Sequence, residues 1–274
     1  MGATPLITTN NPQNTRSTKP DQAKGLLGPD HPDTLASRNN LAGACKSAGR
    51  LDEAIALYEQ VLTDHIRVLD EDHPDTLASR NNLASAYESA GRLDEAIALY
   101  KHVIADCTRV LGDDHPNTLT SRNNLAGAYA SAGRLTEAIA LYEQVLTDRT
   151  RVLGEDHPDT LATRNNLAGA YHAAGRLTEA ITLYEQVLTD TTRVLGEDHP
   201  HTLASRNNLA HAHALDGNLA EAIKQWQSVW IDCHKFLGPA HPLTGTVREN
   251  LEAARRELEQ QEEDSANEAS KQED

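Results

Sequence analysis

Residues 154–195 read GEDHPDTLATRNNLAGAYHAAGRLTEAITLYEQVLTDTTRVL, and this stretch decides the fold because close copies of it fill most of the chain. His-Pro pairs begin at residues 31, 73, 115, 157, 199 and 241, so every step is 42 residues with no insertion. Five complete units follow, at 28–69, 70–111, 112–153, 154–195 and 196–237, and the third and fourth share 34 of 42 residues. Such a period predicts a repeat protein that uses one structural solution five times.

Each unit carries signals for two helices, which we call helix A and helix B. In the fourth unit Pro158 suits the first helical position and Gly175 suits a left-handed stop, which predicts helix A between them. Helix B is predicted to be capped by Thr178 and to run to about residue 195. Neighbouring pairs are expected to stack, because one pair cannot bury the apolar stripe of helix B, which comprises Ala180, Ile181, Leu183, Tyr184, Val187 and Leu188.

The composition narrows the class of protein. Only 38% of the 274 residues are hydrophobic, with one Phe, one Met and two Trp, which favours a thin array over one large core. A net charge of −16 would repel nucleic acid and anionic lipid, so neither is expected as a partner. The sequence shows no signal peptide or apolar run of membrane-spanning length, and Cys45, Cys107 and Cys233 lack metal-binding spacing. We therefore expect a cytoplasmic protein with free thiols.

The unit resembles the tetratricopeptide repeat, in the 42-residue variety found in kinesin light chains and in many bacterial proteins. The resemblance covers about 28–260 and rests on the LGxxHP linker, the NNLA segment and the positions of Leu167-Ala168, Tyr171, Gly175, Ala180, Tyr184 and Val187-Leu188. It implies an all-α, right-handed superhelical solenoid of five helix pairs. It also implies a concave groove, lined mainly by A helices, that binds peptides or partner proteins. Kinesin light chains carry a heptad coiled coil ahead of their repeats, whereas residues 1–27 are short and polar, which argues against a motor-associated role.

The two ends of the array differ from its middle. Residues 1–27 are expected to be a disordered segment, which leaves the first helix A with an uncovered flank. An amphipathic helix over 242–260 is expected to cap the solenoid of 28–260. The acidic residues 261–274 are expected to form a disordered tail.

Neither catalysis nor a bound metal or cofactor is predicted. Near copies of one helix pair offer no asymmetric active site, no catalytic motif is present, and Cys45 is interpreted as a small core residue. A metal shared by His201, His211 and His213 is not expected either. The His-Pro histidines recur on stacked helices ~8–10 Å or more apart, too far to share one ion. We interpret them as extended residues at the start of helix A, namely His31, His73, His115, His157, His199 and His241.

An amide-rich stripe on helix A is the candidate binding site, because an Asn side chain can bond both polar groups of a peptide bond. The resemblance implies that the second Asn of each unit holds a ligand's backbone, that is, Asn40, Asn82, Asn124, Asn166 and Asn208. The first Asn lies either in the groove or against the neighbouring helix, and the same alternative exists for the second. These first residues are Asn39, Asn81, Asn123, Asn165 and Asn207. Specificity is assigned to the positions that vary between units, Lys46, Glu88, His172 and His211.

Two further features refine this site. The stripe contains Gly or Ser in mid-helix, which costs up to about 1 kcal/mol relative to Ala and favours close approach of a ligand. Lys46 is the only cation of the stripe, so capture of a terminal carboxylate is not expected. Each unit also carries an arginine where kinesin light chains have leucine. We predict that Arg38, Arg80, Arg122, Arg164 and Arg206 pair with helix B residues Asp64, Asp106, Asp148, Asp190 and Asp232, or with Glu59, Glu143 and Glu185, and otherwise await an acidic partner.

These observations predict a non-enzymatic scaffold that binds an extended internal segment of a neutral or basic partner protein through the Asn residues. The alternative is a regulatory or sensor array of a signalling system, or a structural solenoid that stacks on itself. The protein is accordingly expected to be a monomer, or to self-associate weakly through its N-terminal repeat.

Overall fold

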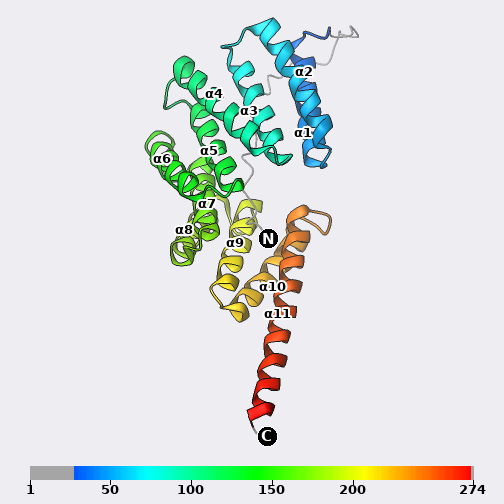
Figure 1. Cartoon of the computed structure of the whole chain (residues 1–274), viewed down its shortest axis with the longest axis vertical. Helices are drawn as coiled ribbons and strands as arrows, with labels where there is room; N and C mark the ends of the chain where they lie inside the picture. The colour runs from blue at the N-terminus through cyan, green and yellow to red at the C-terminus, as the bar shows by residue number, and fades with distance from the viewer. Residues whose placement is uncertain (1–27, 273–274) are drawn as a thin grey trace. The chain divides into compact units, whose positions relative to one another are not determined.

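A computed structural model describes residues 28–272, and in this range the chain forms eleven helices and no strand (Figure 1). The A helices are α1 (Pro32–Ser47), α3 (Pro74–Ser89), α5 (Pro116–Ser131), α7 (Pro158–Ala173) and α9 (Pro200–Leu215). The B helices are α2 (Leu51–Leu69), α4 (Leu93–Leu111), α6 (Leu135–Leu153), α8 (Leu177–Leu195) and α10 (Leu219–Phe236). The all-α class and the two helices per unit are confirmed, whereas the prediction for residues 1–27 lies outside the described residues.

The His-Pro pairs start the A helices as predicted. His157 has extended backbone (φ −66°, ψ 136°), and its Nδ1 accepts a hydrogen bond from the N–H of Asp159 at 3.2 Å, while Pro158 occupies the first turn. The same bond, of 3.1–3.2 Å, recurs at all six histidines. Gly175 ends the fourth A helix with φ 73°, a conformation that favours glycine. The histidines therefore serve as helix caps.

Helix B begins differently from the prediction. Arg176 takes the cap position of α8 without a side-chain cap bond, and Thr178 lies inside the first turn, so the prediction of Thr178 as the cap was wrong. The Arg176 guanidinium instead bonds Glu179 at 2.9 Å and lies 4.3 Å from the centre of the Tyr171 ring. The first turn is thus fixed by an arginine that links both helices of the pair.

The apolar stripes of α2, α4 and α8 each form a core with the A helices before and after them. One cluster joins Ile55 and Tyr58 of α2 to Cys45 of α1 and to Leu83 of α3. Cys45 is buried and free, which confirms its interpretation as a small core residue, and Cys107 and Cys233 are also buried and free. Burial against the next helix pair therefore stabilises each repeat, as expected for a solenoid.

The described residues divide into two compact units, with the boundary inside α6 between Asp148 and Arg149. The N-terminal unit holds α1 to α5 and most of α6, and the C-terminal unit holds the rest of α6 and α7 to α11. In both units, helices consecutive in sequence pack together, α2 on α3 in the first and α8 on α9 in the second. The same stacking mode is therefore repeated within each unit.

The closing helix α11 (Pro242–Gln272) packs on α10 and buries Leu243, Val247, Leu251 and Ala254, which confirms the predicted cap. The helix continues to Gln272 and extends past α10 in Figure 1, so the expectation of a disordered tail was wrong for residues 261–272. This segment has neither Gly nor Pro and is rich in Glu, Gln and Ala, which favour helix even without a core. None of the described helices combines the length and the apolar character needed to span a bilayer.

Candidate binding surface on the A helices

The amide-rich surface of the A helices is called the A-helix stripe below. In the N-terminal unit it comprises Asn40, Lys46, Asn82, Ser85, Glu88, Ser89, Asn124, Gly127 and Ser131, and in the C-terminal unit Asn166, His172, Asn208 and His211. The first Asn of each pair lies beside it.

The asparagines bond one another between consecutive repeats. The second Asn of one A helix donates through Nδ2 to Oδ1 of the first Asn in the preceding A helix. The bonds in the N-terminal unit are Asn82–Asn39 (3.1 Å) and Asn124–Asn81 (3.3 Å). Those in the C-terminal unit are Asn208–Asn165 (3.2 Å) and Asn250–Asn207 (3.1 Å), the last supplied by α11. Repeat packing, the alternative considered for these residues, is therefore a role that both positions fill.

Burial separates the two Asn positions. The first Asn is buried at Asn123, Asn165 and Asn207, and half-buried at the two preceding repeats. The second Asn is exposed at Asn40 and buried at Asn208, and it is half-buried at residues 82, 124 and 166. An Asn amide has two N–H donors and an acceptor oxygen, so one bond between repeats does not use its full capacity. The second Asn is thus the more exposed member of the pair in the first, third and fourth repeats, whereas both members are half-buried in the second repeat and both are buried in the fifth.

Charged side chains occupy the stripe in the N-terminal unit. Lys46 Nζ donates to Ser85 Oγ at 2.8 Å, and Glu88 accepts from Ser131 Oγ at 3.1 Å and from the Tyr100 hydroxyl at 3.4 Å. Burial lowers the pKa of Lys46 and raises the pKa of Glu88, because both charged forms lose water. Two partly desolvated groups of opposite charge therefore mark this part of the surface.

Gly127 of the stripe has a structural reason that the sequence did not reveal. A Cβ atom at Gly127 would lie 3.3 Å from the hydroxyl of Tyr142, which belongs to the B helix of the same pair. At the equivalent Gly43, a Cβ atom would lie 3.4 Å from the Tyr58 hydroxyl. Gly127 therefore makes room for a tyrosine of the core, and close approach of a ligand is not required to explain it.

Histidines replace the charged pair in the C-terminal unit. The rings of His172 and His211 are tilted, with centroids 4.9 Å apart, and Trp226 lies 6.3 Å from His211. Burial lowers the pKa of His172 and brings the pKa of His211 to about 4, so both rings are neutral at pH 7. The sequence grouped His211 with His201, but His201 contacts His199 at 5.1 Å. No group of three metal-binding side chains occurs in the part of the chain that the structure describes.

The repeated arginines form the predicted ion pairs with helix B. The shortest N–O distances are 2.9 Å for Arg38–Asp64 and Arg80–Asp106, 3.6 Å for Arg122–Asp148, 2.5 Å for Arg164–Asp190 and 2.7 Å for Arg206–Asp232. A second set, which the sequence analysis missed, links the end of helix B to the preceding linker, through Arg67–Asp30, Arg109–Asp72 and Arg193–Asp156. The signal for this set is its constant separation of 37 residues.

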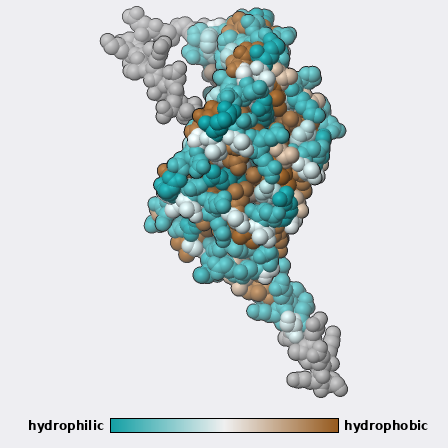
Figure 2. All heavy atoms as spheres, turned by 90° about the vertical axis from the view of Figure 1, so that its left-hand side faces the viewer, coloured by the Kyte–Doolittle hydropathy of each residue, from teal (hydrophilic) through white to brown (hydrophobic). Residues whose placement is uncertain are grey.

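The face shown in Figure 2 has hydrophobic residues broken up by hydrophilic ones. Most of the exposed large apolar residues are single positions on the B helices and repeat with the period, such as Val110, Val152 and Val194, each 37–38% exposed. Scattered apolar residues of this kind are normal on a protein surface. The A-helix stripe is therefore the stronger candidate for recognition.

Paired helices with a recurring surface define this protein as a helical-repeat scaffold. The family model described as tetratricopeptide repeat matches residues 21–64, 48–107, 75–149, 123–190 and 160–229. These matches span most of the chain, which belongs to the tetratricopeptide repeat family. Repeats of this family form scaffolds of the kind used in protein–protein interaction.

Solved structures place the chain near kinesin-light-chain-type repeats. One of these structures, from Podosopora anserina, consists of tetratricopeptide-like repeats of this type that are nearly identical to one another. This chain shares 35% sequence identity with it, and the TM-score is 0.61 over 76% of this chain and 98% of that chain. BtubC (BKLC) from P. vanneervenii is 21% identical, with a TM-score of 0.62 over 77% and 83% of the two chains. A Rap protein complexed with Competence and Sporulation Factor is 12% identical, with a TM-score of 0.63 over 87% and 70%. The last two share the fold alone, and no curated protein sequence matches significantly.

Proposed function

We propose that this protein is a non-catalytic scaffold that binds an extended segment of a partner protein along the A-helix stripe. The observation that carries the proposal is the recurrence, in repeats of a protein-binding family, of an Asn amide that is held by the neighbouring repeat and yet is still reachable. Asn82 and Asn124 are such amides in the N-terminal unit, and the half-buried Asn166 of the C-terminal unit is assigned the same contact with a peptide. An extended peptide presents an N–H and a C=O in every residue, which these amides can bond.

The bonds between repeats would give these amides their affinity for a peptide. Because Asn82 and Asn124 are held by the preceding Asn, less side-chain freedom is lost when a ligand binds. Asn39, Asn81, Asn123, Asn165 and Asn207 are in this account supports and not contacts.

Variation along the stripe would select the partner. Lys46 and Glu88 present charge in the N-terminal unit, and His172 and His211 present rings in the C-terminal unit. The net charge of −16 favours a neutral or basic partner over an acidic one or a nucleic acid. We place the protein in the cytoplasm as a monomer, with the regulatory array as the alternative role.

The test compares recovery of partners by the wild type and two variants. Asn124→Ala/Asn166→Ala removes two half-buried amides, whereas Asn117→Ala removes an exposed Asn from the first turn of α5, outside the stripe. We expect the double variant to lose partner affinity by about tenfold or more, the effect of one or two hydrogen bonds, and Asn117→Ala to bind as the wild type does. Equal binding by all of them would refute the proposal.

A steric variant separates ligand contact from repeat packing. Asn124 also bonds Asn81, so its loss alone can loosen the array. Ser89→Trp fills an exposed position of the stripe and leaves every Asn bond in place. It is expected to block binding without lowering the unfolding temperature, and normal binding by this variant would place the partner elsewhere.

A further inference from the structure

The first repeat presents a packing surface that later repeats have covered. Leu41 of α1 is 52% exposed, whereas its equivalents Leu83, Leu125 and Leu209 are 5–6% exposed. Ala44 is likewise exposed, while the equivalent alanines of these repeats are fully buried. Together with Thr34 and Ser37, these residues form what we call the open face of α1. Its exposure results only from its position in the array, because the residues themselves repeat.

The internal copies of this face show which structure fits it. In the N-terminal unit, Leu83 packs against Ile55 and Tyr58 of the preceding B helix, and Leu125 packs against the corresponding Ile and Tyr of α4. In the C-terminal unit, Leu209 packs against Tyr184, with Ile181 and Leu188 at the edge of the cluster. Each cover is an amphipathic helix with Ile, Tyr and an aliphatic residue at positions i, i+3 and i+7.

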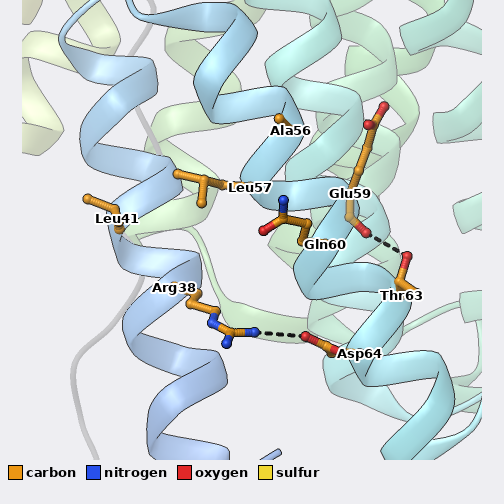
Figure 3. A pocket seen from close by; sticks show the side chains of 8 residues that line it. All are labelled: Arg38, Leu41, Ala56, Leu57, Glu59, Gln60, Thr63 and Asp64. Atoms are coloured by element: carbon orange, nitrogen blue, oxygen red, sulfur yellow. Dashed lines mark hydrogen bonds and ion pairs between the residues drawn. The ribbon is translucent and has the colours of Figure 1, made fainter. Parts of the chain in front are cut away.

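A cavity borders the open face at Leu41, where no helix among the described residues precedes α1. It has a volume of about 730 Å³ between α1 and α2, with Leu41, Ala56 and Leu57 on its apolar side. Figure 3 shows Leu41 and Leu57 on neighbouring helices, with the Arg38–Asp64 ion pair at the opposite side of the cavity. The equivalent cavity in the fifth repeat has about 340 Å³, and there Leu188 of the preceding B helix is one of the lining residues.

We propose that the open face of α1 docks an amphipathic helix of a partner protein that carries the Ile, Tyr and aliphatic pattern of a B helix. Three internal interfaces provide the template for this contact, and Leu41 is the equivalent of a leucine that is buried in each of them. A second copy of the chain is a poorer occupant, because α2, α4, α8 and α10 already use their apolar faces against the next helix. This surface is distinct from the A-helix stripe, and binding at one does not require the other.

The test uses a peptide of residues 177–195, the sequence of α8, as the probe. A fluorescent version of it is titrated into the full chain, and binding is measured by anisotropy. We expect saturable binding that weakens at least tenfold in Leu41→Lys, since a charge would then enter the apolar contact. Ile231→Lys, at another exposed apolar position on α10, is the matched control and is expected to bind normally.

Two further arms keep the result unambiguous. A peptide with Ile181→Ser and Tyr184→Ser is expected not to bind, whereas Asn124→Ala/Asn166→Ala in the protein is expected to leave peptide binding unchanged. Absence of peptide binding, or equal binding by wild type and Leu41→Lys, overturns the proposal. A concentration-dependent dimer in size-exclusion measurements that Leu41→Lys abolishes also overturns it, because the occupant is then a second copy.

Discussion

The two ends of the repeat array differ in whether the apolar face of the last helix is covered. At the C-terminal end, α11 imitates an A helix: it begins with His241-Pro242, and Asn250 bonds Asn207 as the second Asn of a repeat does. It thereby covers α10. At the other end, α1 has no preceding helix among the described residues, and Leu41 faces solvent. The difference teaches that one repeat has two unlike faces, and that an A helix without a B helix can close only one end.

Breaking the C-terminal closure should have the largest effect. Val247→Asp/Leu251→Asp places two carboxylates at buried positions of α11, and we expect a loss of more than about 4 kcal/mol in the free energy of unfolding. Urea denaturation followed by circular dichroism measures it. Arg255→Asp/Arg256→Asp adds the same residues at exposed positions of this helix and should stay within about 1 kcal/mol of wild type. Equal losses would mean that α11 is not a cap.

Equivalent leucines at a covered face and at the open face provide the next comparison. Leu209→Ala is expected to cost about 2–4 kcal/mol, because a buried side chain leaves a cavity. Leu41→Ala should change the free energy of unfolding by about 0.5 kcal/mol or less, because Leu41 is half exposed. Denaturation midpoints of the two variants test this, and a similar cost for both would show that the open face is covered in solution.

The histidine pair makes stability depend on pH. Burial lowers the folded-state pKa of His172 and of His211 below the unfolded value of 6.5, so the unfolded chain binds protons first. Stability is therefore complete above about pH 6.5 and falls as the pH decreases toward 4, by about 1–2 kcal/mol at pH 5 after allowance for partial exposure. The double variant His172→Ala/His211→Ser takes the residues of the equivalent positions Ala130 and Ser85. It should reduce this decline, and the remainder is expected from His65, His199 and His201, whose pKa values burial also lowers. An unchanged decline in the double variant would assign the pH effect to other groups.

The smallest effect concerns a linker. Asp70 has φ 83° and ψ 174°, whereas the equivalent positions hold glycine, such as Gly112 and Gly196. A backbone with positive φ of this kind costs a non-glycine residue about 1–2 kcal/mol. Asp70→Gly also loses the hydrogen bond from Asp72 N–H to Asp70 Oδ1, so we expect a net increase of about 1 kcal/mol in the free energy of unfolding. Thermal unfolding measures the gain, and Gly196→Asp should show a loss of similar size. A destabilised Asp70→Gly would contradict this reason.

Features that depend only on residues of the same 42-residue repeat could be predicted from the sequence. The histidine caps follow from His-Pro, and the pairing of Arg38 with Asp64 follows from a charge repeated on facing helices. Contacts between repeats could not be predicted, because they depend on the offset between stacked helices. An Asn can bond a ligand or another Asn equally well, so the Asn82–Asn39 bond was only an alternative. The His172–His211 contact also joins two repeats, and no local pattern indicates it.

The most direct test of the account is the behaviour of the Asn side-chain amides in solution. Amide resonances of ¹⁵N-labelled protein are assigned by substitution and followed while a peptide from a captured partner is added. The account predicts that the signals of Asn82 and Asn124 in the N-terminal unit shift with a common affinity and that the signal of Asn166 in the C-terminal unit also shifts, while those of Asn123 and Asn165 shift little. Shifts confined to exposed B-helix residues, such as Thr147 and Thr189, would contradict it.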